Sequence, residues 1–304
     1  CQVLEEPVCT KEGYHGKGTV LLLSKNRKSG VDDRMNIIIS PAKKMNVRED
    51  ELDWADLPCF LSKAEELKEY IRGLSRSEAR ALWQCNETIA GLNYGRFQAM
   101  DLTGRLTPAL LSYEGIQYQY MAPGVFETRH WDYVQQHLRI LSGFYGILRP
   151  LDGIVPYRLE MQAKVKLPPD CGSQEGITSL YEYWGDLLYR ELVKEDKVVV
   201  NLASKEYSKA IEPFLTPDIT YLTCVFGILE ADKKGRPKVK VKATEAKMAR
   251  GEMVRFMAEH EVSCPEELKG FDGLGYCYHG ELSGEKEYVF LKGQKDAIAV
   301  PGFS

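Results

Sequence analysis

Positive charge is concentrated between residues 232 and 255, where nine lysines and arginines stand against three acidic residues. The whole 304-residue chain has a formal net charge of −4 at pH 7. If 237–242 is a strand, alternate lysines share one of its faces because side chains of a strand alternate. These lysines are Lys238, Lys240 and Lys242. Followed by Lys247 and Arg250 on a helix, they match the spacing of phosphate charges along DNA. The alternative is a solvated edge strand that lysines protect from aggregation.

A second segment of polar and basic residues, 201–209, follows an apolar run at 198–200. Ser204 can cap a helix beginning there, and the free amides of that helix can meet an anion. The carboxyl ends of strands in open sheets are also where ligands usually lie. The candidate residues are Asn201, Ser204, Lys205 and Lys209. A capped helix without a ligand is the alternative interpretation.

Ser40 and Lys43 have the Ser-x-x-Lys spacing that lets a lysine activate a serine nucleophile. The Ser-Asp-Asn and Lys-Thr-Gly companions of that motif are missing, as are Gly-x-Ser-x-Gly and His-x-x-x-His. Classical hydrolases are therefore not supported. The eight cysteines include no Cys-x-x-Cys pair, so we expect no structural metal site and reduced thiols in a cytoplasm.

Glycines, prolines and aromatic residues are dense between residues 143 and 161, which is typical of an ordered binding loop. Arg149, Arg158 and Glu160 are its charged candidates. Within it, 141–146 loosely resembles the glycine-rich turn of helix-hairpin-helix DNA-binding modules, with one residue too many between its glycines. This interpretation competes with a strand over 138–142.

Apolar runs bounded by turn residues predict buried strands that position these residues. The runs are 37–41, 138–142 and 198–204, with 110–112 as a weaker case. Helical patterns alternate with them at 62–72, 77–92, 129–138, 178–194, 205–212 and 244–260. Runs at 219–226 and 237–241 predict an antiparallel hairpin around the turn at 233–236. The pattern predicts an α/β fold, a single domain with a mixed sheet covered by helices.

The apolar and charged contents, 44% and 28%, are those of an ordinary globular protein. No apolar run approaches the roughly 20 residues of a membrane span. Residues 1–34 are glycine-rich and partly basic, and a strand follows Met35 at once. We therefore expect an amino-terminal extension or a misassigned start at 1–34, then a domain at 35–292 and a tail at 293–304.

From Met35 onward the chain resembles the YaaA peroxide-stress protein family of bacteria. The matching segments are 39–43, 135–152, 156–161, 183–186, 201–207 and 246–251. The resemblance implies an α/β fold of unusual topology with a positively charged cleft and a helix-hairpin-helix-like element. It also implies DNA binding and protection against hydrogen peroxide by limiting free iron. The basic positions that it carries over are Lys43, Arg139, Arg149, Arg158, Lys247 and Arg250.

Together these observations predict a cytoplasmic protein that binds the backbone of double-stranded DNA with little sequence preference, because phosphate contacts position a protein without specifying a sequence. The expected cleft contains Arg149, Arg158, Lys205, Lys247 and Arg250, flanked by the lysines of 237–242. No cofactor, membrane contact or directly bound metal is expected, since no carboxylate or histidine cluster has ligand spacing.

The competing hypothesis is an enzyme acting on a nucleic acid or nucleotide, such as a lyase or glycosylase. In it, Ser40, Lys43, Glu160, Ser204 and Lys205 meet in the same cleft. A lysine desolvated there can become a nucleophile that forms a Schiff base.

Overall fold

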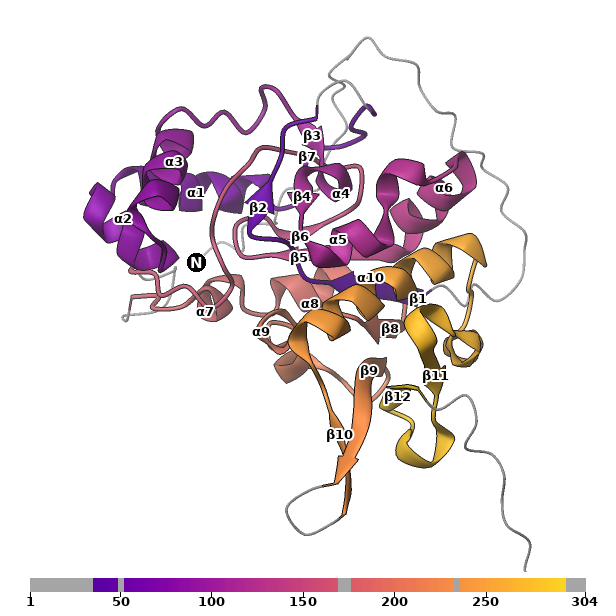
Figure 1. Cartoon of the computed structure of the whole chain (residues 1–304). Coiled ribbons are helices and arrows are strands. Elements are labelled where there is room, and N and C mark those ends of the chain that lie inside the picture. The colour runs from indigo at the N-terminus through magenta and orange to yellow at the C-terminus, as the bar shows by residue number, and fades with distance from the viewer. Residues whose placement is uncertain (1–34, 49–51, 169–175, 232–235, 294–304) are drawn as a thin grey trace, which may run out of the picture.

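The strand β1 (Met35–Ile39) forms the middle of the sheet in the computed structural model, and all five of its residues are buried (Figure 1). It pairs in parallel with β5 (Leu138–Ser142) on one side and with β8 (Val198–Asn201) on the other. A strand covered on both faces needs apolar side chains at successive positions. The three apolar runs that predicted buried strands are therefore confirmed.

The sheet has eight strands and is mixed, in the order β11, β12, β9, β8, β1, β5, β6, with β10 paired to β9. The further strands are β6 (Gly146–Leu148), β9 (Thr220–Ala231), β10 (Pro237–Lys240), β11 (Tyr276–Tyr278) and β12 (Glu287–Lys292). Neighbours from β12 to β5 run parallel, whereas β6, β10 and β11 are antiparallel to their partners. Two small ladders join β2 (Lys44–Met45) to β4 (Tyr113–Glu114) and β3 (Thr107–Pro108) to β7 (Gly153–Ile154). The predicted α/β class with a mixed sheet is confirmed.

The structure describes residues 35–48, 52–168, 176–231 and 236–293. The expected extension at 1–34, most of the tail at 293–304 and most of the hairpin turn at 233–236 lie outside these ranges.

Ten α-helices surround the sheet within the described ranges (Figure 1). They are α1 (Leu61–Arg72), α2 (Arg76–Trp83), α3 (Glu87–Gln98), α4 (Ala109–Ser112), α5 (Ile116–Met121), α6 (Thr128–His137), α7 (Leu180–Trp184), α8 (Leu187–Leu192), α9 (Lys205–Ser208) and α10 (Ala243–Glu259). The predictions for α1, α6 and α10 are confirmed to within one residue at their starts.

Two predicted helices are each divided in the structure. The prediction over 77–92 was wrong because Gln84 adopts a left-handed conformation, φ 45°, that ends α2, and Asn86 then caps α3. The prediction over 178–194 was wrong because Gly185, at φ 48°, ends α7. The weaker strand prediction at 110–112 was also wrong, since these residues lie in α4; a short apolar run does not distinguish the two structures.

The segment 141–146 is a turn between two antiparallel strands, in which Ser142 pairs with Gly146. The Ser142 hydroxyl accepts the backbone N–H groups of Phe144 and Tyr145 at 3.1 and 2.9 Å, which closes the turn. Gly146 adopts φ 77°, and a Cβ there would lie 2.9 Å from the Trp184 ring. The strand prediction for 138–142 holds, and the helix-hairpin-helix-like element predicted for this segment is not confirmed.

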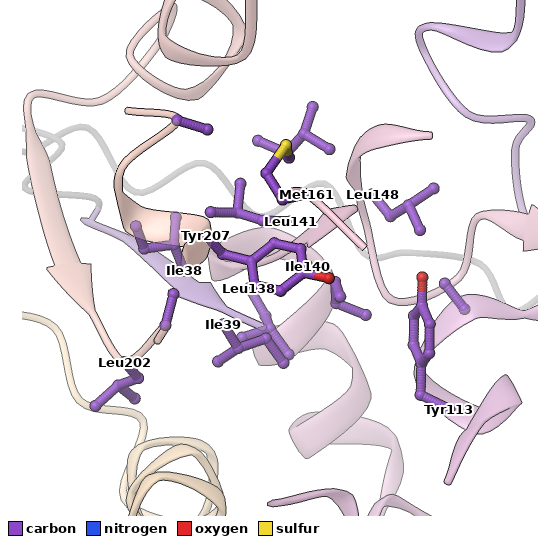
Figure 2. Close-up of a cluster of buried hydrophobic side chains, with 14 of the residues drawn as sticks. Ile38, Ile39, Tyr113, Leu138, Ile140, Leu141, Leu148, Met161, Leu202 and Tyr207 are labelled. Atoms are coloured by element: carbon purple, nitrogen blue, oxygen red, sulfur yellow. The ribbon is translucent and has the colours of Figure 1, made fainter. Parts of the chain in front are cut away.

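A continuous apolar core lies under the central strands, where Figure 2 shows side chains of β1 and β5 together with Leu202 and Tyr207 from the segment after β8. Ile39, Leu138 and Leu141 are fully buried there.

Helix α10 packs directly on α5 at Gly251, where a Cβ would stand 2.0 Å from the Gln117 carbonyl oxygen. Only glycine permits this backbone approach, so Gly251 determines how closely α10 and α5 sit.

Strands β9 and β10 form the predicted antiparallel hairpin, with Lys238 opposite Glu230. Figure 1 shows this ribbon extending away from the body of the domain. Lys238 and Lys240 of β10 therefore lie on a part of the chain that projects from the domain.

Candidate nucleic-acid interface

A cavity of about 370 Å³ opens at the carboxyl ends of β1 and β8. Ser40 follows β1 and Ser204 follows β8, and the two strands are parallel neighbours, so their ends meet. The Ser204 N–H donates to the Ser40 hydroxyl at 2.8 Å, and the two hydroxyl oxygens lie 3.1 Å apart. The Tyr118 hydroxyl donates to the Ser40 carbonyl at 3.0 Å. Hydrogen bonds thus hold the two strand ends and α5 together around the cavity.

The wall of this cavity carries more positive than negative charge. Its basic residues are Lys43, Lys44, Arg158, Lys247 and Arg250. Its acidic residues are Glu114, Glu160 and Glu206. The excess of cations suits an anionic ligand, although the chain as a whole is acidic.

Glu160 is shared between two of the cations. Its carboxylate oxygens lie 2.8 Å from Lys43 Nζ and 3.0 Å from Arg158 Nη2. The side chains of Arg158 and Glu160 are only 11% and 17% exposed, so this arrangement is held in place. At the rim, Lys44 pairs with Glu114 at 2.6 Å. These ion pairs neutralise part of the positive charge of the wall.

Lys247 and Arg250 supply the uncompensated charge. They stand three residues apart on α10 and therefore share a face of that helix. Among the residues that the structure describes, no carboxylate lies within ion-pair distance of either one. Burial lowers the pKa of Arg250, and its Nε has no hydrogen-bond partner. A ligand with acceptor oxygens would supply what these two side chains lack.

Glu206 makes the charge of the cavity dependent on pH. Burial raises its pKa, and the nearby charge of Glu160 adds to that effect. Its carboxylate accepts the Gln162 N–H at 3.3 Å, which opposes the rise. As pH falls, Glu206 is protonated before an exposed glutamate is, and the cavity then becomes more positive.

The structure thus brings together seven of the residues predicted from the sequence. They are Ser40, Lys43, Arg158, Glu160, Ser204, Lys247 and Arg250. Asn201, at the end of β8, lies outside the lining. It accepts the Ala203 N–H at 2.9 Å and donates to the Thr223 hydroxyl at 3.2 Å, which shapes the turn after β8.

Lys205 and Lys209 point away from the cavity. Lys205 is 81% exposed and pairs with Glu212 at 2.6 Å. The Lys209 ammonium stands 4.9 Å from the centre of the Tyr181 ring, a cation–π contact. In and just after α9, Lys205 and Lys209 lie on the side away from the cavity, whereas Glu206 and Tyr207 line it.

Arg139 and Arg149 surround a different group, the buried carboxyl of Asp152. Arg139 donates to the Leu138 carbonyl at 2.9 Å, and burial lowers its pKa to about 10. The Arg149 N–H donates to Asp152 at 2.8 Å. Burial raises the pKa of Asp152 to about 7 against the opposing charges of both arginines. Neither arginine lines the cavity.

The three lysines of the expected row are exposed on the ribbon or just after it. Lys240 pairs with Glu230 at 2.9 Å, and Lys242 pairs with Glu245 at 3.3 Å. None of the three lines the cavity. Within 236–255, the part of that segment that the structure describes, the positive charge is thus divided between two surfaces, the ribbon and the face of α10.

Several lining residues were missed from the sequence. Gln117 and Tyr118 belong to α5, a helix of six residues that is too short to show a helical pattern. Glu206 lay within the predicted segment but was not singled out, because nothing in the local sequence indicates that this half-buried carboxylate faces the cavity.

Within the described ranges, no three histidine, cysteine, aspartate or glutamate side chains gather closely enough to hold a metal ion. No helix there is both long enough and apolar enough to cross a membrane.

Comparison with known proteins identifies the family of this chain. The family described as "Peroxide stress protein YaaA" matches residues 35–282. The UPF0246 protein of Agathobacter rectalis is 52% identical over 256 residues, 84% of this chain and 98% of that protein. The UPF0246 protein of Desulfitobacterium hafniense is 53% identical over 258 residues, 85% and 98% of the two chains. That of Lactiplantibacillus plantarum is 45% identical over 257 residues, 84% and 99%. The chain belongs to the YaaA peroxide stress protein family.

Proposed function

We propose that this protein binds the backbone of double-stranded DNA in the cavity between β1, β8 and α10, as part of a cytoplasmic response to peroxide stress. The observation that carries the proposal is the pair Lys247 and Arg250, which line the cavity with no carboxylate of the described residues within ion-pair distance. Arg158 adds a buried guanidinium whose Nε also has no hydrogen-bond partner. Guanidinium groups suit phosphate because their donors match its oxygens.

This mode of binding has two physical consequences. Contacts to phosphates carry no sequence information, so duplexes of unrelated sequence should bind alike. Each neutralised phosphate releases counterions, so the logarithm of the association constant should fall linearly with the logarithm of salt concentration. The role in iron homeostasis that the resemblance implies stays a prediction, since none of the contacts described above bears on it.

The proposal is tested by fluorescence anisotropy with a labelled duplex across a salt series. The variant Lys247→Ala should bind every duplex more weakly, and the slope of the salt dependence should decrease by about 1. Lys205→Ala is the matched control, because it removes the same charge from an exposed lysine outside the cavity. A salt-independent affinity, or equal slopes for the two variants, would contradict the proposal.

The β9–β10 ribbon would supply a second surface for the same DNA backbone. We expect reversal of Lys238, Lys240 and Lys242 to glutamate to weaken binding to all sequences alike. The effect should be smaller than that of changes in the cavity, because Lys240 and Lys242 already face Glu230 and Glu245. A loss confined to particular sequences would assign the ribbon to base recognition.

The enzyme remains a second candidate because Ser40, Lys43, Glu160 and Ser204 meet in the cavity. Lys43 does not resemble the desolvated lysine that such chemistry uses, since its side chain is 65% exposed and ion-paired. Borohydride trapping on damaged DNA distinguishes the two functions. A covalent adduct that disappears in Lys43→Ala would favour the enzyme, and unchanged DNA affinity without an adduct would favour binding alone.

A further inference from the structure

Three side chains around the cavity carry buried N–H donors that no acceptor meets. They are Gln117 Nε2, Arg158 Nε and Arg250 Nε. Gln117 is the most informative, because the residue is only 6% exposed and lies on α5 across from α10. Leaving a buried donor unpaired costs about 1–3 kcal/mol. A site that holds three such donors is built for a ligand rich in acceptor oxygens or ring nitrogens.

Apart from Ser40 and Ser204, most of the remaining lining is apolar or aromatic. It includes Ile116, Leu159 and the three tyrosines Tyr118, Tyr157 and Tyr207. Ligand sites combine such a wall with a few polar groups that fix orientation, and they enclose roughly 300–1,000 Å³. The volume of about 370 Å³ is at the small end of that range. A phosphate backbone lying across a groove would need neither the aromatic wall nor the depth.

We propose that the cavity takes one nucleoside monophosphate unit, with its phosphate on the α10 cations and its base against the tyrosine wall. The unit comes either from a free nucleotide or from a nucleotide turned out of a DNA strand, as in enzymes that extrude a base into a pocket. Glu160 and Glu206 supply acceptors for hydroxyl or exocyclic amino groups of the ligand, which inorganic phosphate lacks. This inference rests on the proposed function, because both use Lys247 and Arg250.

The first arm of the test is titration calorimetry with free deoxyadenosine monophosphate. We expect saturable binding of one molecule per chain, about tenfold tighter than inorganic phosphate or deoxyadenosine, since each probe lacks one half of the contacts. Gln117→Leu should weaken this binding about tenfold, the value of roughly one hydrogen bond to a buried donor. Gln119→Leu is the matched control, because Gln119 is exposed on the same helix and lies outside the cavity lining.

Lys247→Ala is a second variant at an exposed position, so its folding is not at risk. It should weaken binding of the monophosphate and leave binding of deoxyadenosine unchanged. No saturable binding of the monophosphate, or inorganic phosphate binding as tightly, would overturn the inference.

The second arm compares a fully paired duplex with one carrying a single unpaired adenosine. Tighter binding of the second duplex, lost in Gln117→Leu, assigns the site to a nucleotide within a strand. Equal binding of the two duplexes, together with saturable monophosphate binding, assigns it to a free nucleotide. Salt-dependent duplex binding without monophosphate binding would overturn this inference and leave the proposed function intact. Monophosphate binding without any duplex binding would overturn the proposed function and leave the monophosphate site intact.

Discussion

The buried carboxyl of Asp152 should make the protein less stable as pH rises. Asp152 is only 4% exposed, and burial raises its pKa to about 7, although Arg149 and Arg139 oppose the rise. In the unfolded chain the same carboxyl has its ordinary pKa near 3.9. Between these two values the folded state holds the proton more tightly than the unfolded state does. The free energy of unfolding must therefore decrease as pH increases through this window.

The size of this effect follows from the shift in pKa. One unit corresponds to about 1.4 kcal/mol, so the slope from this single group approaches 1.4 kcal/mol per pH unit. Between pH 5 and pH 7 the loss amounts to about 2 kcal/mol, and it levels off at about 3 kcal/mol by pH 8, because the folded carboxyl is itself half ionised at pH 7. Other titrating groups add their own slopes, so the effect of Asp152 must be isolated by substitution.

Asp152→Asn removes the charge and keeps an oxygen that can accept the Arg149 N–H. Urea unfolding is followed by the fluorescence of the four tryptophans at pH 5, 6, 7 and 8. Relative to the original protein, the variant should gain about 3 kcal/mol in free energy of unfolding from pH 5 to pH 8. Asp53→Asn, at an exposed position, serves as the control and should give no such gain. Parallel pH profiles for Asp152→Asn and the original protein would refute the reasoning.

Further outcomes are expected for four other substitutions. Gly251→Ala should lower the free energy of unfolding by about 1–3 kcal/mol or more, because its Cβ would press on Gln117. Gly95→Ala, with nothing within 4 Å of its Cβ, should raise it by up to about 1 kcal/mol in the same chemical unfolding assay. Ser142→Ala should cost about 2–3 kcal/mol in that assay, since two buried N–H groups lose their acceptor; a smaller loss would mean that the turn closes without the hydroxyl. Duplex affinity at constant salt should rise as pH falls, and less so in Glu206→Gln, because protonation of Glu206 removes a negative charge from the cavity; identical profiles would contradict this.

The sheet was predictable from the sequence because its central strands are buried on both faces. Unbroken apolar runs mark two of these strands, residues 37–39 in β1 and residues 198–200 in β8. Helix boundaries were less predictable, since Gln84 and Gly185 break helices through their backbone conformation and not through polarity.

The site was predictable in part for a similar reason. Ser40 and Ser204 were identified because they follow strands, and the ends of parallel neighbours must meet. Whether a basic side chain of α9 faces the cavity depends on its angular position around the helix axis, which differs between adjacent residues. That is why Lys205 and Glu206, which are adjacent in sequence, ended on opposite sides.

The place of β1 at the centre of the sheet also bears on how the chain is made. A ribosome releases residues 35–39 before all other described elements, yet the two strands that flank them end only at residues 142 and 201. Until both have been synthesised, Ile37, Ile38 and Ile39 have no sheet to enter and stay open to unwanted association. Contacts so distant along the chain also slow folding after release. We therefore expect this segment to depend on being shielded from other chains while the rest of the protein is synthesised.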